Sequence, residues 1–127
     1  MINLNQHFSY HDIMTSLKMI ADEFPEFTIY RNIGRSHDGR DIPMMRVGFG
    51  METLICTAGV HGKESINPPV FLKMIEDYCL AYHTRGLIEG VDVHSMLNKY
   101  SICFIPLLNP DGYEIAMYGL DAIHNSL

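Results

Sequence analysis

Two side chains of the kinds that bind metal ions stand three residues apart, in the segment Gly59-Val60-His61-Gly62-Lys63-Glu64. Catalytic zinc is held by histidine nitrogen and carboxylate oxygen, with three protein ligands and one open position for water. A tight turn at Gly62 would bring Glu64 back toward an ion bound by His61. The spacing therefore makes His61 and Glu64 candidate ligands of a zinc site.

The same spacing also has an ordinary structural explanation. Carboxylates favour the first turn of a helix, because the N-terminal end of a helix carries a partial positive charge. In that case Glu64 would serve the helix that follows, and His61 would be a loop histidine without a metal. A pair of residues is a weak motif by itself, so the position of the pair in the fold matters more than the pair.

The elements around this segment predict such a position. Residues 53–60 are apolar almost without alternation, which is typical of a strand covered on both faces. A second strand of this kind is predicted at 100–108. Between them a helix begins near Asn67-Pro68-Pro69, since proline is tolerated in the first turn of a helix. Strand, helix and strand at this spacing indicate a right-handed parallel crossover.

The first part of the chain is predicted to form a helix and a hairpin. Apolar residues recur three and four apart over 13–24, with Ser9 as the N-cap. Residues 27–33 and 42–48 are predicted to be antiparallel strands, because Asp38-Gly39 between them suits a tight turn. The fold class is therefore α/β, with a mixed sheet and helices on its faces. The buried stripe of the helix after residue 66 is predicted to comprise Ile66, Val70, Phe71, Met74, Ile75, Tyr78 and Cys79.

Two turns follow the predicted parallel strands, at 59–64 and at 109–113. In open α/β sheets, ligands bind beyond the carboxyl ends of the strands. Asn109-Pro110-Asp111-Gly112 is a favourable turn sequence, and a purely structural turn is its ordinary role. Its interest lies in its place after a strand predicted to neighbour the one that delivers His61.

Three segments together resemble one family, the zinc metallocarboxypeptidases typified by carboxypeptidase A. TAGVHGKES (57–65) resembles the zinc-ligand segment of that family, and IPLLNPDGYE (105–114) resembles its next strand and turn. NIGRSHDGRDIPMMRVG (32–48) resembles the hairpin that opens its catalytic domain. The three matches occur in the family's order and cover nearly the whole chain from about residue 10 onward.

The resemblance implies a fold, a cofactor and a reaction. The fold would be a three-layer α/β/α sandwich with a mixed sheet, of which this chain would supply about the first four strands and two or three helices. His61 and Glu64 would be the first two ligands of one zinc ion. The reaction would be hydrolysis of a peptide bond, in which zinc polarises the carbonyl and activates a water while a glutamate handles the protons.

The resemblance also implies residues that this chain does not supply. The family's third ligand, its catalytic glutamate and its substrate-binding arginines all follow the NPDG turn. His124 is the nearest later histidine, but it does not fall in the third-ligand motif. We therefore expect residues 1–127 to be the N-terminal part of a catalytic domain, truncated and inactive by itself. The alternative is a non-catalytic module on the same fold that binds peptides without cleaving them.

The substrate class is left with two alternatives. YGLDAIHNSL (118–127) resembles bacterial members that cut peptidoglycan stem peptides between γ-D-glutamate and a diamino acid. Trimming of ordinary peptides at the C-terminus is the other possibility. Lys63, Arg40 and Arg46 are candidate anion binders, although a solvated surface side chain is the more ordinary explanation for each of them.

Composition limits the partners. The formal charge of −6 argues against nucleic acid, which requires a basic surface. No apolar run is long enough to span a bilayer, and no secretory signal is visible, so we expect a cytoplasmic protein without a membrane partner. Cys56, Cys79 and Cys103 are expected to be buried free thiols. A sheet that stops partway exposes an edge strand, which predicts self-association.

Overall fold

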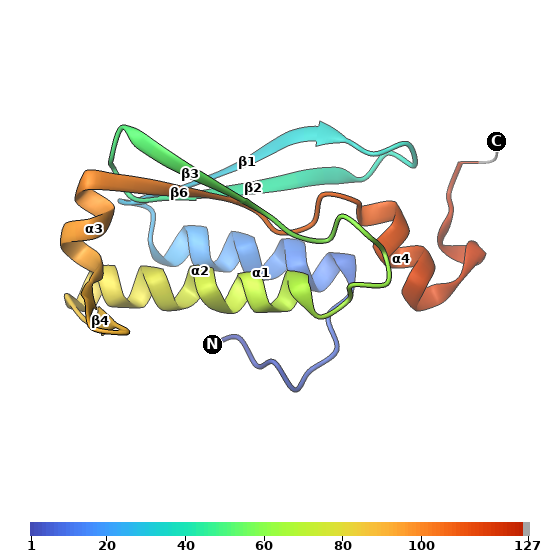
Figure 1. Ribbon diagram of the computed structural model, residues 1–127. Helices are drawn as coiled ribbons and strands as arrows, with labels where there is room; N and C mark the ends of the chain where they lie inside the picture. Colours follow the sequence, from blue (N-terminus) through green and yellow to red (C-terminus); the bar gives the residue numbers. More distant parts are fainter. Residues whose placement is uncertain (126–127) are drawn as a thin grey trace.

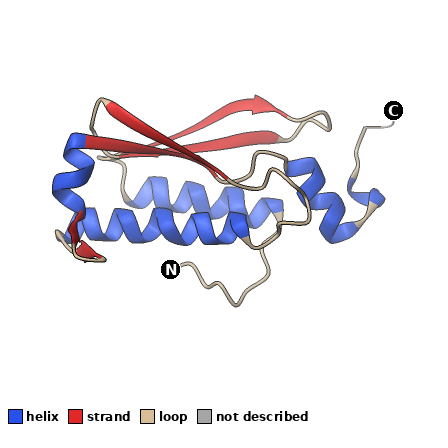
Figure 2. Cartoon of the chain, in the orientation of Figure 1, coloured by secondary structure: helices blue, strands red, loops and turns tan. Residues whose placement is uncertain are grey.

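The computed structural model describes residues 1–125, in which a four-stranded mixed sheet lies on two long helices (Figure 1). Figure 2 shows the strands of this sheet as one layer and the helices α1 and α2 as a second layer beneath it. The last two residues of the predicted segment 118–127 lie outside the described residues. The mixed sheet and the α/β class expected from the sequence are therefore present, and residues 1–125 form four α-helices where two or three were expected.

The order of the elements explains how the sheet is built. The sheet has the strand order β1-β2-β6-β3, while β4 and β5 form a separate small ribbon. β1 pairs with β2 antiparallel, and β3 pairs with β6 parallel, so the predicted hairpin and crossover are both confirmed. The elements are α1 (Tyr10–Glu23), β1 (Thr28–Arg35), β2 (Asp41–Val47), β3 (Glu52–Thr57), α2 (Asn67–Thr84), β4 (Leu87–Ile88), β5 (Val91–Asp92), α3 (Val93–Lys99), β6 (Tyr100–Ile105), α4 (Pro110–Tyr118) and the short 3₁₀ helix η1 (Leu120–Ala122).

Helix α1 begins where the sequence predicts. The Ser9 hydroxyl accepts a hydrogen bond from the Asp12 amide at 3.1 Å, and the Asp12 carboxylate accepts one from the Ser9 amide at 2.9 Å. This reciprocal capping box satisfies two backbone donors that would otherwise lack partners. Ile13 and Leu17 are completely buried on the face toward the core, which confirms the predicted periodicity.

The predicted buried stripe of α2 is only partly correct. Phe71 faces the sheet and meets Phe104 of β6 edge to face, with 5.7 Å between the ring centroids. Ile66 is 71% exposed and precedes the helix, whereas Leu72 and Glu76 are buried although they were not predicted. The helix has two inward sides, because it packs against α1 and the N-terminal segment as well as against the sheet. Ile75 and Cys79 are buried as predicted, and Phe71, Met74 and Tyr78 are partly buried against the core.

Strand β3 contradicts the expectation of a strand buried on both faces. It is the last strand of the sheet, and the side chains of Leu54 and Ile55 are 62% and 64% exposed. Within residues 1–125 no helix covers the face of the sheet opposite α1 and α2, and no further strand pairs with the free edge of β3 (Figure 1). The apolar run correctly located the strand, but burial also depends on neighbours that the described residues do not provide.

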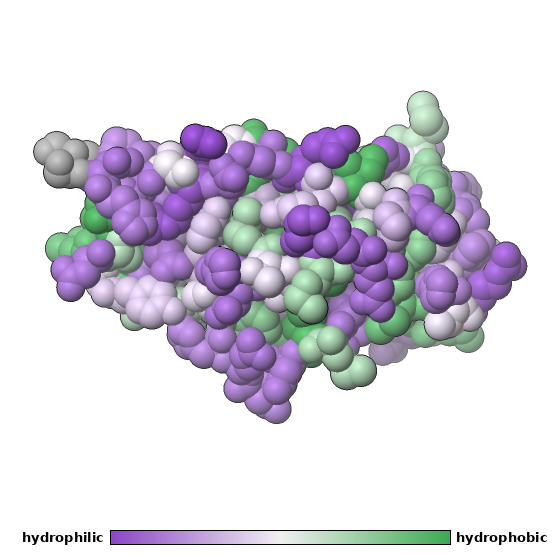
Figure 3. Space-filling model, turned by 180° about the vertical axis from the view of Figure 1, so that it is seen from behind, coloured by the Kyte–Doolittle hydropathy of each residue, from purple (hydrophilic) through white to green (hydrophobic). Residues whose placement is uncertain are grey.

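The surface is correspondingly mixed. Seen from behind, hydrophobic side chains reach the surface in patches between hydrophilic ones (Figure 3).

Cys79 is buried and its pKa is raised to about 12 by burial, while Cys56 and Cys103 are half-buried; all three are free thiols. In residues 1–125 no helix has both the length and the apolar character needed to cross a membrane.

Candidate metal site

The turns after β3 and β6 lie side by side, as the parallel pairing requires. The last paired residues are Thr57 and Ile105, and the pairing continues irregularly beyond them. The Leu108 amide donates to the carbonyl of Ala58 at 3.0 Å, and the Asn109 amide donates to that of Gly59 at 2.8 Å. The predicted convergence of the two turns at one edge of the sheet is thus confirmed.

His61 and Glu64 stand on a single turn between β3 and α2. The Glu64 amide donates to the His61 carbonyl at 3.0 Å, which closes the turn. Both side chains are exposed. The Glu64 carboxylate accepts a long hydrogen bond of 3.4 Å from the Asn67 side chain and forms no ion pair with any residue in 1–125. Both donor groups therefore face solvent.

The helix-capping explanation for Glu64 receives no support from this geometry. Ile66 is the N-cap residue of α2, and no side chain caps the helix there. The first turn of α2 contains no acidic residue, so Glu64 lies before it. A carboxylate that stabilises a helix start would accept from its free amides, and the Glu64 carboxylate contacts only the side chain of Asn67 among the described residues.

Close packing between two glycines fixes the distance between the turns. A Cβ placed on Gly62 would lie 2.2 Å from the Gly112 carbonyl oxygen, so no larger residue fits without displacing backbone. Asn109 adds a second tie, since its side-chain amide donates to the Val60 carbonyl at 3.2 Å. The Asn109 side-chain oxygen accepts from the Gly112 amide at 3.0 Å and caps α4. The turn that carries His61 therefore rests on the NPDG turn.

Arg40 is not a solvated side chain, because groups of this chain occupy its guanidinium. Its side chain is 9% exposed and pairs with two carboxylates, Asp38 at 2.7 Å and Asp111 at 3.0 Å. It also donates to the Ala122 carbonyl at 2.6 Å. No sequence signal predicted this cluster, because Arg40 and Asp111 are separated by 71 positions. Only the turn chemistry of Asp38-Gly39 was visible in the sequence.

The other two candidate anion binders differ from Arg40. Arg46 is half-buried on the open face of the sheet and donates to the Gly50 carbonyl at 3.0 Å. Lys63 is exposed and makes no hydrogen bond or ion pair within residues 1–125. His124, which the sequence left unassigned, donates its backbone amide to the Asp38 carboxylate at 2.8 Å.

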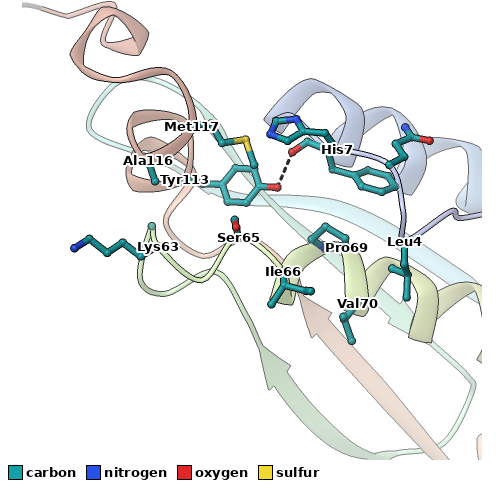
Figure 4. A pocket seen from close by; sticks show the side chains of 13 residues that line it. Leu4, His7, Lys63, Ser65, Ile66, Pro69, Val70, Tyr113, Ala116 and Met117 are labelled. Atoms are coloured by element: carbon teal, nitrogen blue, oxygen red, sulfur yellow. Dashed lines mark hydrogen bonds between the residues drawn. The ribbon is translucent and has the colours of Figure 1, made fainter.

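A pocket of about 600 Å³ adjoins the turn after β3 (Figure 4). It lies between the start of α2, helix α4 and the N-terminal segment, and its walls include Gly62, Ser65, His7 and Met117. Tyr113 lines it from α4 and donates its hydroxyl to the Phe8 carbonyl at 2.6 Å, which holds the N-terminal segment in place. His61 and Glu64 do not line it, so the pocket is beside the predicted ligands rather than around them.

The donor set at the turn fits part of a zinc site. One imidazole and one carboxylate on a solvent-facing turn match the ligand types of a catalytic zinc site. Residues 1–125 contain no group of three or more histidine, cysteine, aspartate or glutamate side chains placed to hold a metal. Two ligands bind zinc more weakly than three, because each ligand adds affinity and fixes geometry.

Comparisons with known proteins agree with the geometry. The family model described as "Zinc carboxypeptidase" matches residues 13–123. The gamma-D-glutamyl-L-diamino acid endopeptidase 1 of Lysinibacillus sphaericus is 27% identical over 94% of this chain and 30% of its own length. The inactive metallocarboxypeptidase ECM14 of Ajellomyces capsulatus is 30% identical over 80% of this chain and 17% of its own. This chain thus spans less than a third of the length of each of these two relatives.

The fold is shared with solved carboxypeptidases. The structure of carboxypeptidase A from Helicoverpa armigera superposes with a TM-score of 0.72, at 24% identity, over 95% of this chain and 29% of that one. At this level of identity the superposition establishes a common fold. The family match covers most of the chain, and the sheet, the crossover and the two adjoining turns are those expected for it. The chain belongs to the zinc carboxypeptidase family.

Proposed function

We propose that this chain supplies the N-terminal part of the catalytic domain of a zinc-dependent peptidase and that His61 and Glu64 are the first two metal ligands of that domain. The observation that carries the proposal is the free, solvent-facing pair of donors on the turn after β3, beside the turn after β6. When bound, zinc would polarise a substrate carbonyl and lower the pKa of a water. The chain's own contribution would be to hold one imidazole and one carboxylate on a backbone fixed by Gly62 and Asn109.

The proposed substrate is a peptide. Within that class, a peptidoglycan stem peptide is favoured by the Lysinibacillus sphaericus relative, whose name states that it cuts a γ-D-glutamyl-diamino acid bond. Trimming at a peptide C-terminus is the alternative within the family. The pocket of about 600 Å³ beside the turn offers a concave surface of suitable size for part of a peptide.

Metal binding by the purified 127-residue chain tests the ligand assignment. Isothermal titration with zinc should detect a weak site that His61→Ala and Glu64→Ala each abolish. His11→Ala is a matched control, because His11 is also an exposed histidine and lies on α1. Zinc affinity that survives His61→Ala but falls in His11→Ala would refute the assignment.

A second candidate is a non-catalytic peptide-binding module. The relative from Ajellomyces capsulatus favours it, since that metallocarboxypeptidase is named as inactive. Under either candidate we expect the 127-residue chain alone to lack peptidase activity, because it offers two of the three ligands that catalytic zinc requires. Chelator-sensitive cleavage of a γ-D-glutamyl-diamino acid peptide by this chain would refute that expectation.

Self-association through β3 is also proposed for the isolated chain. The strand ends the sheet, and its exposed Leu54 and Ile55 lie next to unpaired backbone groups. An open apolar edge of this kind favours pairing with a strand from another copy. Analytical ultracentrifugation should show a mass that rises with concentration, and Ile55→Lys should reduce it. A concentration-independent monomer would contradict the proposal.

A further inference from the structure

The hairpin turn between β1 and β2 is joined to the first turn of α4 by a cluster of polar groups that are buried or partly buried. Arg40 pairs with Asp38 and Asp111, whose side chains are 3% and 18% exposed. The Ser36 hydroxyl donates to Asp111 Oδ1 at 2.7 Å, and the Asp38 amide donates to Asp111 Oδ2 at 2.9 Å. Both oxygens of Asp111 are thus bonded to the hairpin, which fixes the carboxylate in position and in orientation.

The same short turn is bonded on its other side to the candidate metal site. Asn109 donates a hydrogen bond from its backbone amide to the Gly59 carbonyl and one from its side-chain amide to the Val60 carbonyl. Gly59 and Val60 are the two residues before His61. The Gly112 carbonyl lies against Gly62, the residue after His61. In the chain, Asp111 therefore lies between Asn109 and Gly112, the two residues that contact the turn carrying His61 and Glu64.

We infer that Asp111, held by Arg40 and Ser36, is a positioning residue for the turn that carries His61 and Glu64. That turn has one internal hydrogen bond and exposed side chains, so its backbone position depends on the neighbour on which it rests. Metal ligands must be held to within a fraction of an ångström, and supporting residues provide that precision. The effect on metal rests on the proposed function, whereas the effect on the turn does not.

The first test needs no metal. Asp111→Asn keeps the shape of the side chain and removes its charge, so Arg40 loses one of its two ion pairs. Amide hydrogen exchange of zinc-free protein, followed by NMR, should become about tenfold faster at Glu64 and Asn109. Ser36→Ala removes the hydroxyl that donates to Asp111 and accepts from the Arg40 backbone amide, and it should give the same pattern at about threefold, in a protein that remains folded.

Glu76→Gln is the matched control. It also neutralises a buried, ion-paired carboxylate, but the polar partners of Glu76 are Lys73, the Ile2 amide and the amino group of Met1, and none of them lies in 59–64 or 109–112. It should leave exchange at Glu64 and Asn109 at the wild-type rate. Unchanged exchange in Ser36→Ala and Asp111→Asn, or equal acceleration in Glu76→Gln, would overturn the inference.

The second test uses zinc itself. If His61 binds zinc, its affinity should fall about tenfold in Asp111→Asn, as expected for a supporting residue that makes no contact with the metal, and should be unchanged in Glu76→Gln. Faster exchange in a chain that binds no zinc would uphold the positioning role while the proposed function fails. Zinc binding that depends on His61 but is equal in wild type and Asp111→Asn, with unchanged exchange, would uphold the function and overturn the positioning role.

Discussion

The turn at 61–64 and the turn at 109–112 lie against each other, but they are fixed in different ways. In the second turn Asn109 caps α4 and reaches Val60, Asp111 bonds to the hairpin, and Gly112 donates to Asn109. In the first turn the described bonds are chiefly those of the backbone, and the side chains of His61 and Glu64 face solvent. The position of the first turn therefore depends on the second turn, against which it packs.

The largest expected effect on stability comes from removing the positive charge of Arg40, which holds Asp111 of the second turn. Arg40→Met leaves Asp38 and Asp111 buried without their cation, which should lower the free energy of unfolding by about 3 kcal/mol. This is the low end of the usual range, because Asp111 is 18% exposed and keeps its bond from Ser36. Urea denaturation followed by circular dichroism measures the change.

A control for that substitution lies on the same hairpin. Arg35 pairs with Asp41 at 3.3 Å, but the two side chains are 73% and 41% exposed. Arg35→Met should therefore cost less than about 1 kcal/mol. Equal losses for the two arginines would mean that the cluster around Arg40 is no stronger than an ordinary surface pair.

The contact between the turns is the next target. Gly62→Ala places a methyl group 2.2 Å from the Gly112 carbonyl oxygen, and the forced separation should cost about 2 kcal/mol. Gly34→Ala is the control, because its Cβ would meet only the Ile42 side chain at 3.9 Å and should change stability by less than about 0.5 kcal/mol. Thermal unfolding compares the two. A wild-type melting temperature for Gly62→Ala would show that the turns are not in firm contact.

The elements were largely predictable from the sequence, because their signals are local. Ser9 with Asp12 starts α1, and Asp38-Gly39 turns the hairpin, each through bonds between residues a few positions apart. The pair Arg40 and Asp111 was not predictable, because it depends on the arrangement of the whole sheet. Burial of β3 was predicted wrongly for the related reason that an apolar run reveals a strand but not its neighbours.

Substitutions of Asn109 should have a smaller effect on stability, and they distinguish its bond to the Val60 carbonyl from its bond to the Gly112 amide. Asn109→Ala removes the N-cap of α4 and the tie to Val60, at a cost of about 1 kcal/mol. Asn109→Asp keeps an oxygen that can accept from Gly112 but has no amide to donate to Val60, so it should retain most of the stability. Urea denaturation measures both. Equal losses would show that the tie to Val60, and not the cap, carries the stabilisation.

Lowering the pH should gradually remove the stabilisation that the ionised Asp111 carboxylate gives to the turn at 109–112. Burial raises the pKa of Asp111, but hydrogen bonds from Ser36, the Asp38 amide and Arg40 outweigh it and leave the pKa below the usual 3.8. The ionised carboxylate therefore stabilises the fold above that usual value, and the contribution is lost as the pH falls through the lower folded pKa. Between about pH 5 and about pH 2, stability should fall less steeply in Asp111→Asn than in wild type.

The control for this pH dependence is a carboxylate in an exposed pair. Asp22 bonds to Lys18 with both side chains about two-thirds exposed, at 65% and 64%, so Asp22→Asn should leave the steepness near that of wild type. Equilibrium urea curves at several pH values give the comparison. If the free energy of unfolding depends on pH equally steeply in Asp111→Asn and in wild type, the bonds to Asp111 contribute little to stability at neutral pH.

The smallest expected change in stability is at the candidate ligands themselves. His61→Ala and Glu64→Ala each remove an exposed side chain, so each should change the free energy of unfolding of the zinc-free protein by less than about 0.5 kcal/mol. Zinc binding by titration should nevertheless disappear in both. Marked destabilisation by His61→Ala would assign the imidazole a structural role, and the contrast between a bonded turn and a free one would no longer hold.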